Sequence, residues 1–334
     1  MPNSQAPEIK APKVSVIVPV YNTELYVERA IISLMEQTLD DVQFIIIDDG
    51  SKDNSLTIIK QVIARYPARQ DQVTLISRGN RGVAATRAQG MELAAGDYVI
   101  HLDSDDWAEV NWLEELYSKA IENDSDIVTC DYNVITKKRA VHIKQYTPSN
   151  GLECINKMLL GELHGSTCNK LIKRSLIVSN NLSFNKVNYL EDFIFVMQLF
   201  FLAKNITYSG LPLINYNQTN ESSITSVINE SKIKDILKAI DIISSLLIKS
   251  GTANKLALSL LFFKLNQKYW MIYCNRHLIP DNLWGLYPET NFIIWKSKKP
   301  LYSKVALYLG AHRFYFASKM TILLRDKIKN LFRK

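Results

Sequence analysis

The sequence predicts an α/β fold in which a mostly parallel β-sheet is flanked by helices and followed by a mainly helical C-terminal region. Between residues 13 and 120, apolar runs rich in β-branched residues alternate with stretches of helical periodicity. Beyond residue 225, the apolar residues instead recur at helical spacing. Strands that alternate with helices are typical of βαβ units, whose parallel sheet is covered on both faces.

The strands and helices follow one another in a regular order. Residues 13–20 form a buried-strand pattern that breaks at Pro19 and continues into the polar Tyr21-Asn22-Thr23. A second strand at 44–47 ends in the turn sequence Asp48-Asp49-Gly50-Ser51. The other elements are expected as helices at 25–35, 54–66, 82–95 and 107–120, and as strands at 73–76 and 98–102.

An acidic cluster follows the strand at 98–102, with Asp103, Asp105 and Asp106 inside four residues. Carboxylates this close repel one another unless a cation lies among them, and Mg²⁺ or Mn²⁺ prefers such oxygen ligands together with substrate phosphates. Alternate residues of an extended segment project to one side, so Asp103 and Asp105 can face the same ion. The alternative is a solvated turn that caps the next helix.

Polar residues also follow the first and second strands. Ligands of open parallel sheets bind beyond the carboxyl ends of the strands. The segments after residues 20, 47 and 102 therefore predict one shared site at that edge of the sheet. The turn at 48–51 has a second reading, in which it only caps the helix that starts near Asn54, so we expect its two Asp residues to have mixed roles.

A series of motifs in a fixed order leads to a family. Val-Ile-Val-Pro-Val-Tyr-Asn at 16–22, Ile-Asp-Asp-Gly-Ser at 47–51 and Leu-Asp-Ser-Asp-Asp at 102–106 resemble the family 2 glycosyltransferases, inverting enzymes of the GT-A fold found in bacterial cell-surface polysaccharide synthesis. The same pattern includes 80–82, 94–98, 169–171 and 190–193. The resemblance covers 13–225, which implies a catalytic domain between a flexible tail, 1–12, and a helical region, 226–334.

The resemblance assigns roles on the donor side of the site. It implies that Asp49 recognises the base of a nucleotide sugar, and an imide N–H of uracil suits such a carboxylate. Pro19 and Tyr21 would form the adjoining wall, and Arg87 would take part in donor binding. The family pattern has Ala and Asn where this chain has Thr86 and Ala88, which puts local packing or a donor contact in doubt.

The resemblance also assigns the metal and the base. Asp105 would contact Mn²⁺ or Mg²⁺ directly, with Asp103 near the ribose or the metal, so that the ion neutralises the departing diphosphate. Asp192 would be the general base that takes the proton from the acceptor hydroxyl, with Glu191 as the alternative base. Both residues begin the apolar helix expected at 193–203, where acidic side chains are favourable for electrostatic reasons alone.

Composition predicts a cytoplasmic protein that lies against a membrane rather than across it. The four Cys residues are scattered without a CxxC pair, which favours reduced thiols, and residues 1–12 show no secretory signal. The apolar stretch at 256–263 is too short to span a bilayer.

Residues 303–334 carry eight Lys or Arg against one acid, Asp326, although the whole chain has a net charge of only +7. One face of this segment is apolar, at Phe316, Met320, Leu323, Leu324, Ile328 and Leu331. The pattern predicts a basic amphipathic helix that binds an anionic membrane surface, at the inner face of the cell membrane. The alternative is a helix that packs this stripe on the catalytic domain. No nucleic-acid-binding module accompanies the charge.

We therefore expect a metal-assisted, inverting glycosyltransferase that moves a hexosyl or N-acetylhexosaminyl group. Its donor would be a nucleotide sugar, in particular a UDP-sugar, and its acceptor a hydroxyl of a growing glycan or lipid-linked oligosaccharide of a capsule, lipopolysaccharide or exopolysaccharide. One alternative is a sugar nucleotidyltransferase, but the Gly-rich phosphate loop of that class is absent after the first strand. The other is a non-catalytic scaffold on a decayed transferase fold.

Overall fold

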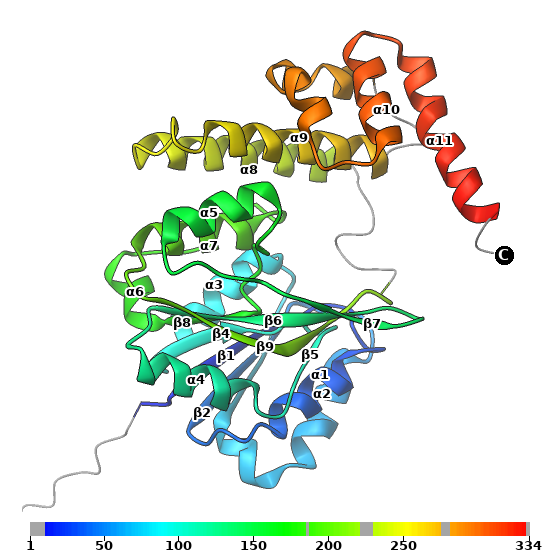
Figure 1. Ribbon diagram of the computed structural model, residues 1–334. Coiled ribbons are helices and arrows are strands. Elements are labelled where there is room, and N and C mark those ends of the chain that lie inside the picture. Colours follow the sequence, from blue (N-terminus) through cyan, green and yellow to red (C-terminus); the bar gives the residue numbers. More distant parts are fainter. Residues whose placement is uncertain (1–10, 185–186, 221–229, 275–280, 332–334) are drawn as a thin grey trace, which may run out of the picture. The chain divides into compact units, whose positions relative to one another are not determined.

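The chain divides into two compact units (Figure 1). The computed structural model describes residues 11–184, 187–220, 230–274 and 281–331, without the side chains of 281 and 325–331. One unit comprises Met1–Ile155 with Leu163–Glu221, and the other comprises Asn156–Glu162 with Ser222–Lys334.

The first four strands form the parallel part of a nine-stranded sheet. β1 (Val14–Val20) pairs in parallel with β2 (Val42–Asp48) and with β4 (Tyr98–His101), and β2 pairs in parallel with β3 (Val73–Ser77). Their runs of Val and Ile suit strands that are buried on both faces. The predicted βαβ order is confirmed here, and the carboxyl ends of β1, β2 and β4 lie at one edge of the sheet.

The remaining strands make the sheet mixed rather than mostly parallel. β8 (Lys170–Lys173) pairs antiparallel with β4, while β6 (Ile127–Ile135) pairs antiparallel with β8 and parallel with β9 (Ile206–Asn217). β5 (Trp107–Ala108) and β7 (Ala140–Ile143) pair antiparallel with β9 and β6. These partners lie far apart in sequence, except in the β6–β7 hairpin, so local periodicity does not reveal their direction.

Helices cover both faces of the sheet (Figure 1). On one face lie α1 (Val27–Met35), α2 (Ser55–Ala64) and α4 (Trp112–Glu122), and on the other lie α3 (Val83–Leu93) and α7 (Glu191–Leu202). Alternate residues of the strands supply the two buried layers, for example Val16 and Val18 toward α4 and Ile17, Ile45 and Val99 toward α3. The unit also contains α6 (Arg174–Ser179) and the 3₁₀ helix η1 (Pro67–Gln72), and α5 (Gly151–Leu160) belongs partly to each unit.

The helix expected at 107–120 begins later than predicted. Trp107 and Ala108 instead form β5, paired with Asn215 and Ile214 of β9, and the helix α4 starts at Trp112. The guanidinium of Arg29 lies 3.3 Å from the centre of the Trp107 ring. The chain turns at the acidic cluster, where Asp106 N–H donates to Asp103 O at 3.0 Å, and it becomes extended at Trp107, because β9 supplies a pairing partner that the local sequence does not show.

The second unit is helical. α8 (Glu230–Lys249) and α9 (Ala257–Cys274) are followed by two 3₁₀ helices, η2 (Asp281–Gly285) and η3 (Pro288–Lys296). α8 buries one stripe at helical spacing, formed by Ile236, Ala239, Ile240, Ile243 and Leu247. No helix among the described residues is long and apolar enough to cross a membrane.

The basic segment at 303–334 is a pair of helices, not the single helix that was predicted. α10 (Leu301–Ala311) and α11 (Tyr315–Leu331) run antiparallel, and Arg313 between them has φ +65° (Figure 1). Gly310 lets α10 lie close to the buried Trp284 ring, because a Cβ at this position would lie 2.0 Å from that ring. The predicted apolar stripe lies within α11, and its members from 325 onward have side chains outside the described residues.

Candidate active site

A buried arginine connects three of the acidic residues predicted from the sequence. Arg87 of α3 is 4% exposed. Its Nη2 lies 2.7 Å from Asp103 Oδ1, and its Nη1 lies 2.5 Å from Glu191 Oε1 and 2.7 Å from Asp192 Oδ1. The segment after β4 and the first turn of α7 therefore meet at one guanidinium. Burial alone would lower the pKa of Arg87, but Asp192, Asp103 and Glu191 hold it well above its usual value.

The Glu191–Asp192 pair is placed to exchange a proton near neutral pH. Burial raises the pKa of Glu191 to about 7 and also raises the pKa of Asp192, while Arg87 opposes both shifts. Asp192 Oδ2 is also contacted by the backbone N–H of Thr167 at 3.4 Å and by its hydroxyl at 3.3 Å. Leu190, directly before the helix, has φ +62°, an unfavourable conformation for this residue.

The cluster after β4 holds more negative charge than its neighbours neutralise. Burial and the nearby Asp103 raise the pKa of Asp105, and burial with Asp105 and Asp103 raises the pKa of Asp106 well above its usual range. Asp105 Oδ2 accepts a hydrogen bond of 2.8 Å from Asn220 Nδ2. Asp106 Oδ1 accepts one of 2.8 Å from the backbone N–H of Asn217, so Asp106 fixes this segment to β9 and does not start a helix.

The donor set fits a hard divalent cation that also binds phosphate. Among the described residues, no group of three or more His, Cys, Asp or Glu side chains could hold a metal ion by itself. Mg²⁺ typically keeps several waters and binds one or two protein carboxylates together with substrate phosphates. Asp103 and Asp105 would therefore be enough protein ligands for it. Burial, and then the negative charge of Asp103, raise the pKa of Asp105, and a bound cation would oppose both effects.

Asp48 and Asp49 make different contacts within their turn. Asp48 stabilises the turn itself, because its carboxylate accepts hydrogen bonds from Ser51 N at 3.1 Å and Ser77 Oγ at 2.8 Å. Asp49 Oδ1 accepts from Arg81 N at 2.9 Å and Oδ2 from Gly82 N at 2.8 Å. These two bonds hold the loop that leads into α3, instead of capping the helix at Ser55.

Sequence reasoning missed the partner of Asp49. Arg78 donates a short hydrogen bond to Asp49 Oδ1, and its other nitrogens donate to Gln89 Oε1 at 2.7 Å and Thr86 Oγ1 at 2.9 Å. Thr86, the residue that departs from the family pattern, thus helps to hold Arg78 against Asp49. Asp49 and Arg78 form a second charged cluster, distinct in its contacts from the one around Arg87.

The remaining predicted donor residues lie at the end of β1. Pro19 is half-buried and pairs with Ile47 of β2, while Tyr21 is 46% exposed. The backbone N–H of Asp49 donates to Val20 O at 2.8 Å, which places this segment beside Asp49. Thr23 Oγ1 donates to Ser104 Oγ at 3.1 Å and so connects the segment to the Asp103–Asp105 region.

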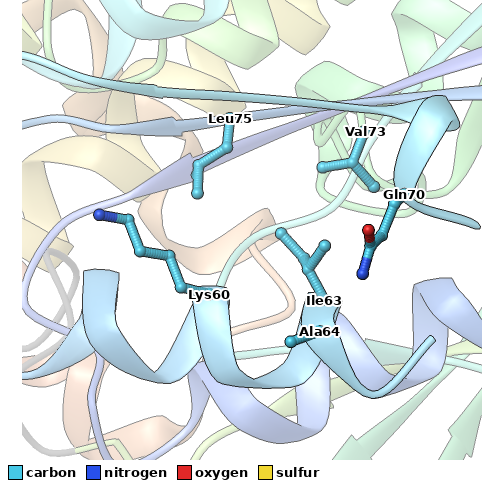
Figure 2. A pocket seen from close by; sticks show the side chains of 6 residues that line it. All are labelled: Lys60, Ile63, Ala64, Gln70, Val73 and Leu75. Carbon is cyan, nitrogen blue, oxygen red and sulfur yellow. The ribbon is translucent and has the colours of Figure 1, made fainter. Parts of the chain in front are cut away.

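A cavity of about 240 Å³ lies elsewhere, between α2 and the edge strand β3 (Figure 2). Its lining is mainly apolar, and Lys60 is its one ionisable side chain among Lys60, Ile63, Ala64, Gln70, Val73 and Leu75. It lacks the carboxylates that characterise the carboxyl edge of the sheet.

Comparison with known proteins decides the family. Residues 15–178 match the family described as Glycosyl transferase family 2. The chain is also 32% identical over 264 residues to the cholesterol galactosyltransferase of Borreliella burgdorferi, over 73% of this chain and 70% of that protein. The chain belongs to glycosyltransferase family 2.

Two further family comparisons concern length and fold. The putative glycosyltransferase EpsH of Bacillus subtilis is 32% identical over 216 residues, or 62% of this chain, and the match spans 61% of EpsH, less than two thirds of its length. The crystal structure of S. aureus TarS 1-349 in complex with UDP-GlcNAc has a TM-score of 0.63 at 17% identity, covering 94% of this chain and 92% of that one. That likeness shows the GT-A fold.

Proposed function

We propose that this chain is an inverting glycosyltransferase that moves a sugar from a UDP-sugar to a hydroxyl group of a growing cell-surface glycan or lipid-linked oligosaccharide. The observation that carries the proposal is the Arg87 cluster. One buried guanidinium contacts both Asp103 and the Glu191–Asp192 pair. Asp103 adjoins the segment suited to binding the diphosphate of the donor, and the Glu191–Asp192 pair is suited to accept the proton of the acceptor. Glycosyl transfer requires these two functions side by side.

Asp192 acts as the general base in this proposal. Its carboxylate takes the proton of the acceptor hydroxyl while the acceptor oxygen bonds to the anomeric carbon. The bond from that carbon to the phosphate oxygen breaks at the same time, and the nucleoside diphosphate leaves with the electron pair. A single displacement of this kind inverts the anomeric configuration. Arg87 and Thr167 hold Asp192 in position, and burial raises the pKa of this carboxyl group, which makes the carboxylate a stronger base.

Asp105 and Asp103 would hold Mn²⁺ or Mg²⁺. The ion would supply a Lewis acid that neutralises charge on the diphosphate. On the same donor side, the Asp49–Arg78 pair offers a carboxylate acceptor and a guanidinium donor to the base. A carboxylate has about four acceptor positions, and three are filled by Arg78, Arg81 N and Gly82 N, so one is left for the imide N–H of uracil.

An Asp192→Asn variant tests the base, because it removes basicity with almost no change of shape. We expect transfer to fall about 10²- to 10⁴-fold, the range that general-base catalysis contributes. UDP binding, measured by calorimetry, should persist. Asp71→Asn is the matched control, since Asp71 is exposed in η1. Full transfer activity in Asp192→Asn would assign the base to another residue.

An Asp105→Ala variant tests the metal site. We expect loss of the metal-stimulated part of transfer and of UDP-dependent Mn²⁺ binding, which calorimetry measures without any turnover. Circular dichroism should show an intact fold, because Asp105 is half-buried and its side chain accepts a hydrogen bond from the single side chain Asn220. Unchanged Mn²⁺ binding in the presence of UDP would exclude Asp105 as a ligand.

We also propose that α11 binds the protein to an anionic membrane surface at the inner face of the cell membrane. In α11, Ser318 and Ile322 are buried, and Ser318 Oγ donates to Ala306 O of α10 at 2.6 Å. Three members of the predicted apolar stripe do not share this packing: Phe316 is 80% exposed, and Met320 and Leu324 are also exposed, whereas Leu323 is half-buried. An exposed apolar stripe in a strongly basic segment suits an interfacial helix.

A further inference from the structure

The loop that precedes β8 is held by a buried lysine, Lys170. Lys170 is fully buried, which lowers the pKa of its ammonium to about 8, and all three of its hydrogens are used. They go to the carbonyls of His164 and Ser166 at 2.8 Å each, and to Asn169 Oδ1 at 2.7 Å. A buried cation is costly unless it is fully hydrogen-bonded, so the loop at 164–169 is held in one shape.

The fixed loop presents one side chain, His164. Its backbone N–H donates to Gln145 Oε1 at 2.8 Å, and its ring Nδ1 accepts from Ser166 N at 3.2 Å. Since Nδ1 accepts, the neutral ring carries its proton on Nε2. The ring packs at a tilt against Tyr132, with centroids 5.4 Å apart, while the residue as a whole remains partly exposed to solvent. Nothing in the described part of the chain accepts the hydrogen of Nε2.

Two observations place the loop of His164 at the Arg87 cluster. Thr167, three residues further along the same loop, contacts Asp192 Oδ2 through both its N–H and its hydroxyl. Asp103 is also within electrostatic reach of the imidazole: the surrounding protein and then Lys170 lower the pKa of His164, and Asp103 opposes them. A lowered pKa keeps the ring neutral, so it can donate one hydrogen bond but adds no positive charge to the site.

We propose that His164 is a positioning residue for the acceptor, whose Nε2–H donates a hydrogen bond to a hydroxyl oxygen of the acceptor sugar while the ring of Tyr132 supports the imidazole. The assignment rests on the proposed glycosyl transfer and identifies the acceptor as a polyhydroxylated sugar. His164 does not serve as the base, because its acceptor nitrogen is already used by Ser166. The hydrogen bond orients the acceptor so that a different hydroxyl faces Asp192.

The two amide variants of His164 separate the roles of its two nitrogens. A glutamine places its side-chain amide near the position of Nε2, whereas an asparagine places its oxygen near Nδ1. If Nε2 binds the acceptor, His164→Gln retains the function and His164→Asn does not. If the ring only supports the loop through Nδ1, the order is reversed. His312→Gln is the control, since His312 is an exposed histidine of the other unit.

The test measures transfer from UDP-glucose, UDP-galactose and UDP-GlcNAc, with MnCl₂, to a set of 4-nitrophenyl glycosides. We expect His164→Ala to raise the KM for the glycoside about 3- to 10-fold, the value of one neutral hydrogen bond, with a smaller change in kcat. His164→Gln should restore KM, His164→Asn should not, and His312→Gln should match the wild type.

Three outcomes would overturn the assignment of His164. The first is an unchanged KM in His164→Ala, and the second is better rescue by Asn than by Gln. Hydrolysis of the donor by the wild type without transfer to any glycoside would also overturn it. The protein would then have no site that binds the acceptor sugar. If the wild type neither hydrolyses nor transfers any of the donors, this result would instead contradict the proposed function itself.

Discussion

Glu191 and Asp192 are adjacent carboxylates whose placement goes beyond what helix capping requires. Both lie in the first turn of α7, where acidic side chains are favoured by the helix dipole, and both contact the same guanidinium. Capping alone would not require their burial beside a third carboxylate, Asp103. Burial of like charges around one cation instead keeps a proton acceptor available near neutral pH.

The pH dependence of transfer should report this pair. Because the pKa of Glu191 is raised to about 7 and that of Asp192 is also raised, protonation inactivates the base as the pH falls through that range. We expect kcat/KM to decline on the acid side of neutrality. Glu191→Gln removes a negative charge facing Asp192, so the acid limb should move to lower pH. The check is a pH profile of both proteins, with the exposed Glu122→Gln as control; an unmoved limb would show that the pair is not coupled.

At the scale of elements, α3 connects the sheet to the Arg87 cluster. Gly90 lets α3 approach β1 closely, because a Cβ there would lie 2.4 Å from Ile17 Cγ2. Thr86 and Arg87, in the preceding turn of the same helix, face the two charged clusters. The position of α3 on β1 therefore determines where both clusters form.

A Gly90→Ala variant should destabilise the protein even though alanine favours helices. Overpacking against a buried strand costs about 1–3 kcal/mol, which exceeds the gain of roughly 1 kcal/mol in helix propensity. Gly79→Ala is the control, because a Cβ at Gly79 would meet nothing within 4 Å. Urea denaturation would measure both variants. Equal stabilities of Gly90→Ala and Gly79→Ala would mean that α3 can shift away from Ile17 without cost.

Local sequence patterns predict those elements whose partners are near in the chain. β1 to β4 and α1 to α3 appear where alternation placed them, because each βα unit buries its own apolar run. The short strand β5 was missed because its partner, β9, lies about a hundred residues away. Arg78 was missed as the partner of Asp49 because their contact depends on how Thr86 and Gln89 are brought together by the folding of α3.

At the scale of the whole molecule, charge is divided unevenly along the chain. No Asp or Glu occurs between Glu289 and Asp326, while Lys and Arg occur seven times in that interval. The same interval contains exposed Phe292, Trp295, Leu301 and Phe314 in addition to Phe316. Basic and apolar groups that share one exposed region suit a surface that is both anionic and apolar, which a phospholipid membrane is.

Substitutions on α11 test this membrane proposal better than deletion of 303–334 would. Deletion would remove α10 and uncover Trp284, whose ring packs against Gly310, so loss of binding could follow from unfolding. Replacing Phe316, Met320 and Leu324 by Ser changes exposed side chains alone.

We expect the triple variant to lose most of its binding to vesicles with phosphatidylglycerol in a flotation assay, because each buried CH₂ contributes about 0.8 kcal/mol to membrane binding. Leu258→Ser on α9 removes a similarly exposed leucine outside the basic segment and should bind as the wild type does. High salt should weaken the wild-type interaction, since attraction between a basic helix and anionic lipid is screened. Binding that survives the triple substitution would assign the contact to another surface, whereas equal binding to neutral phosphatidylcholine vesicles would remove the electrostatic part of the proposal.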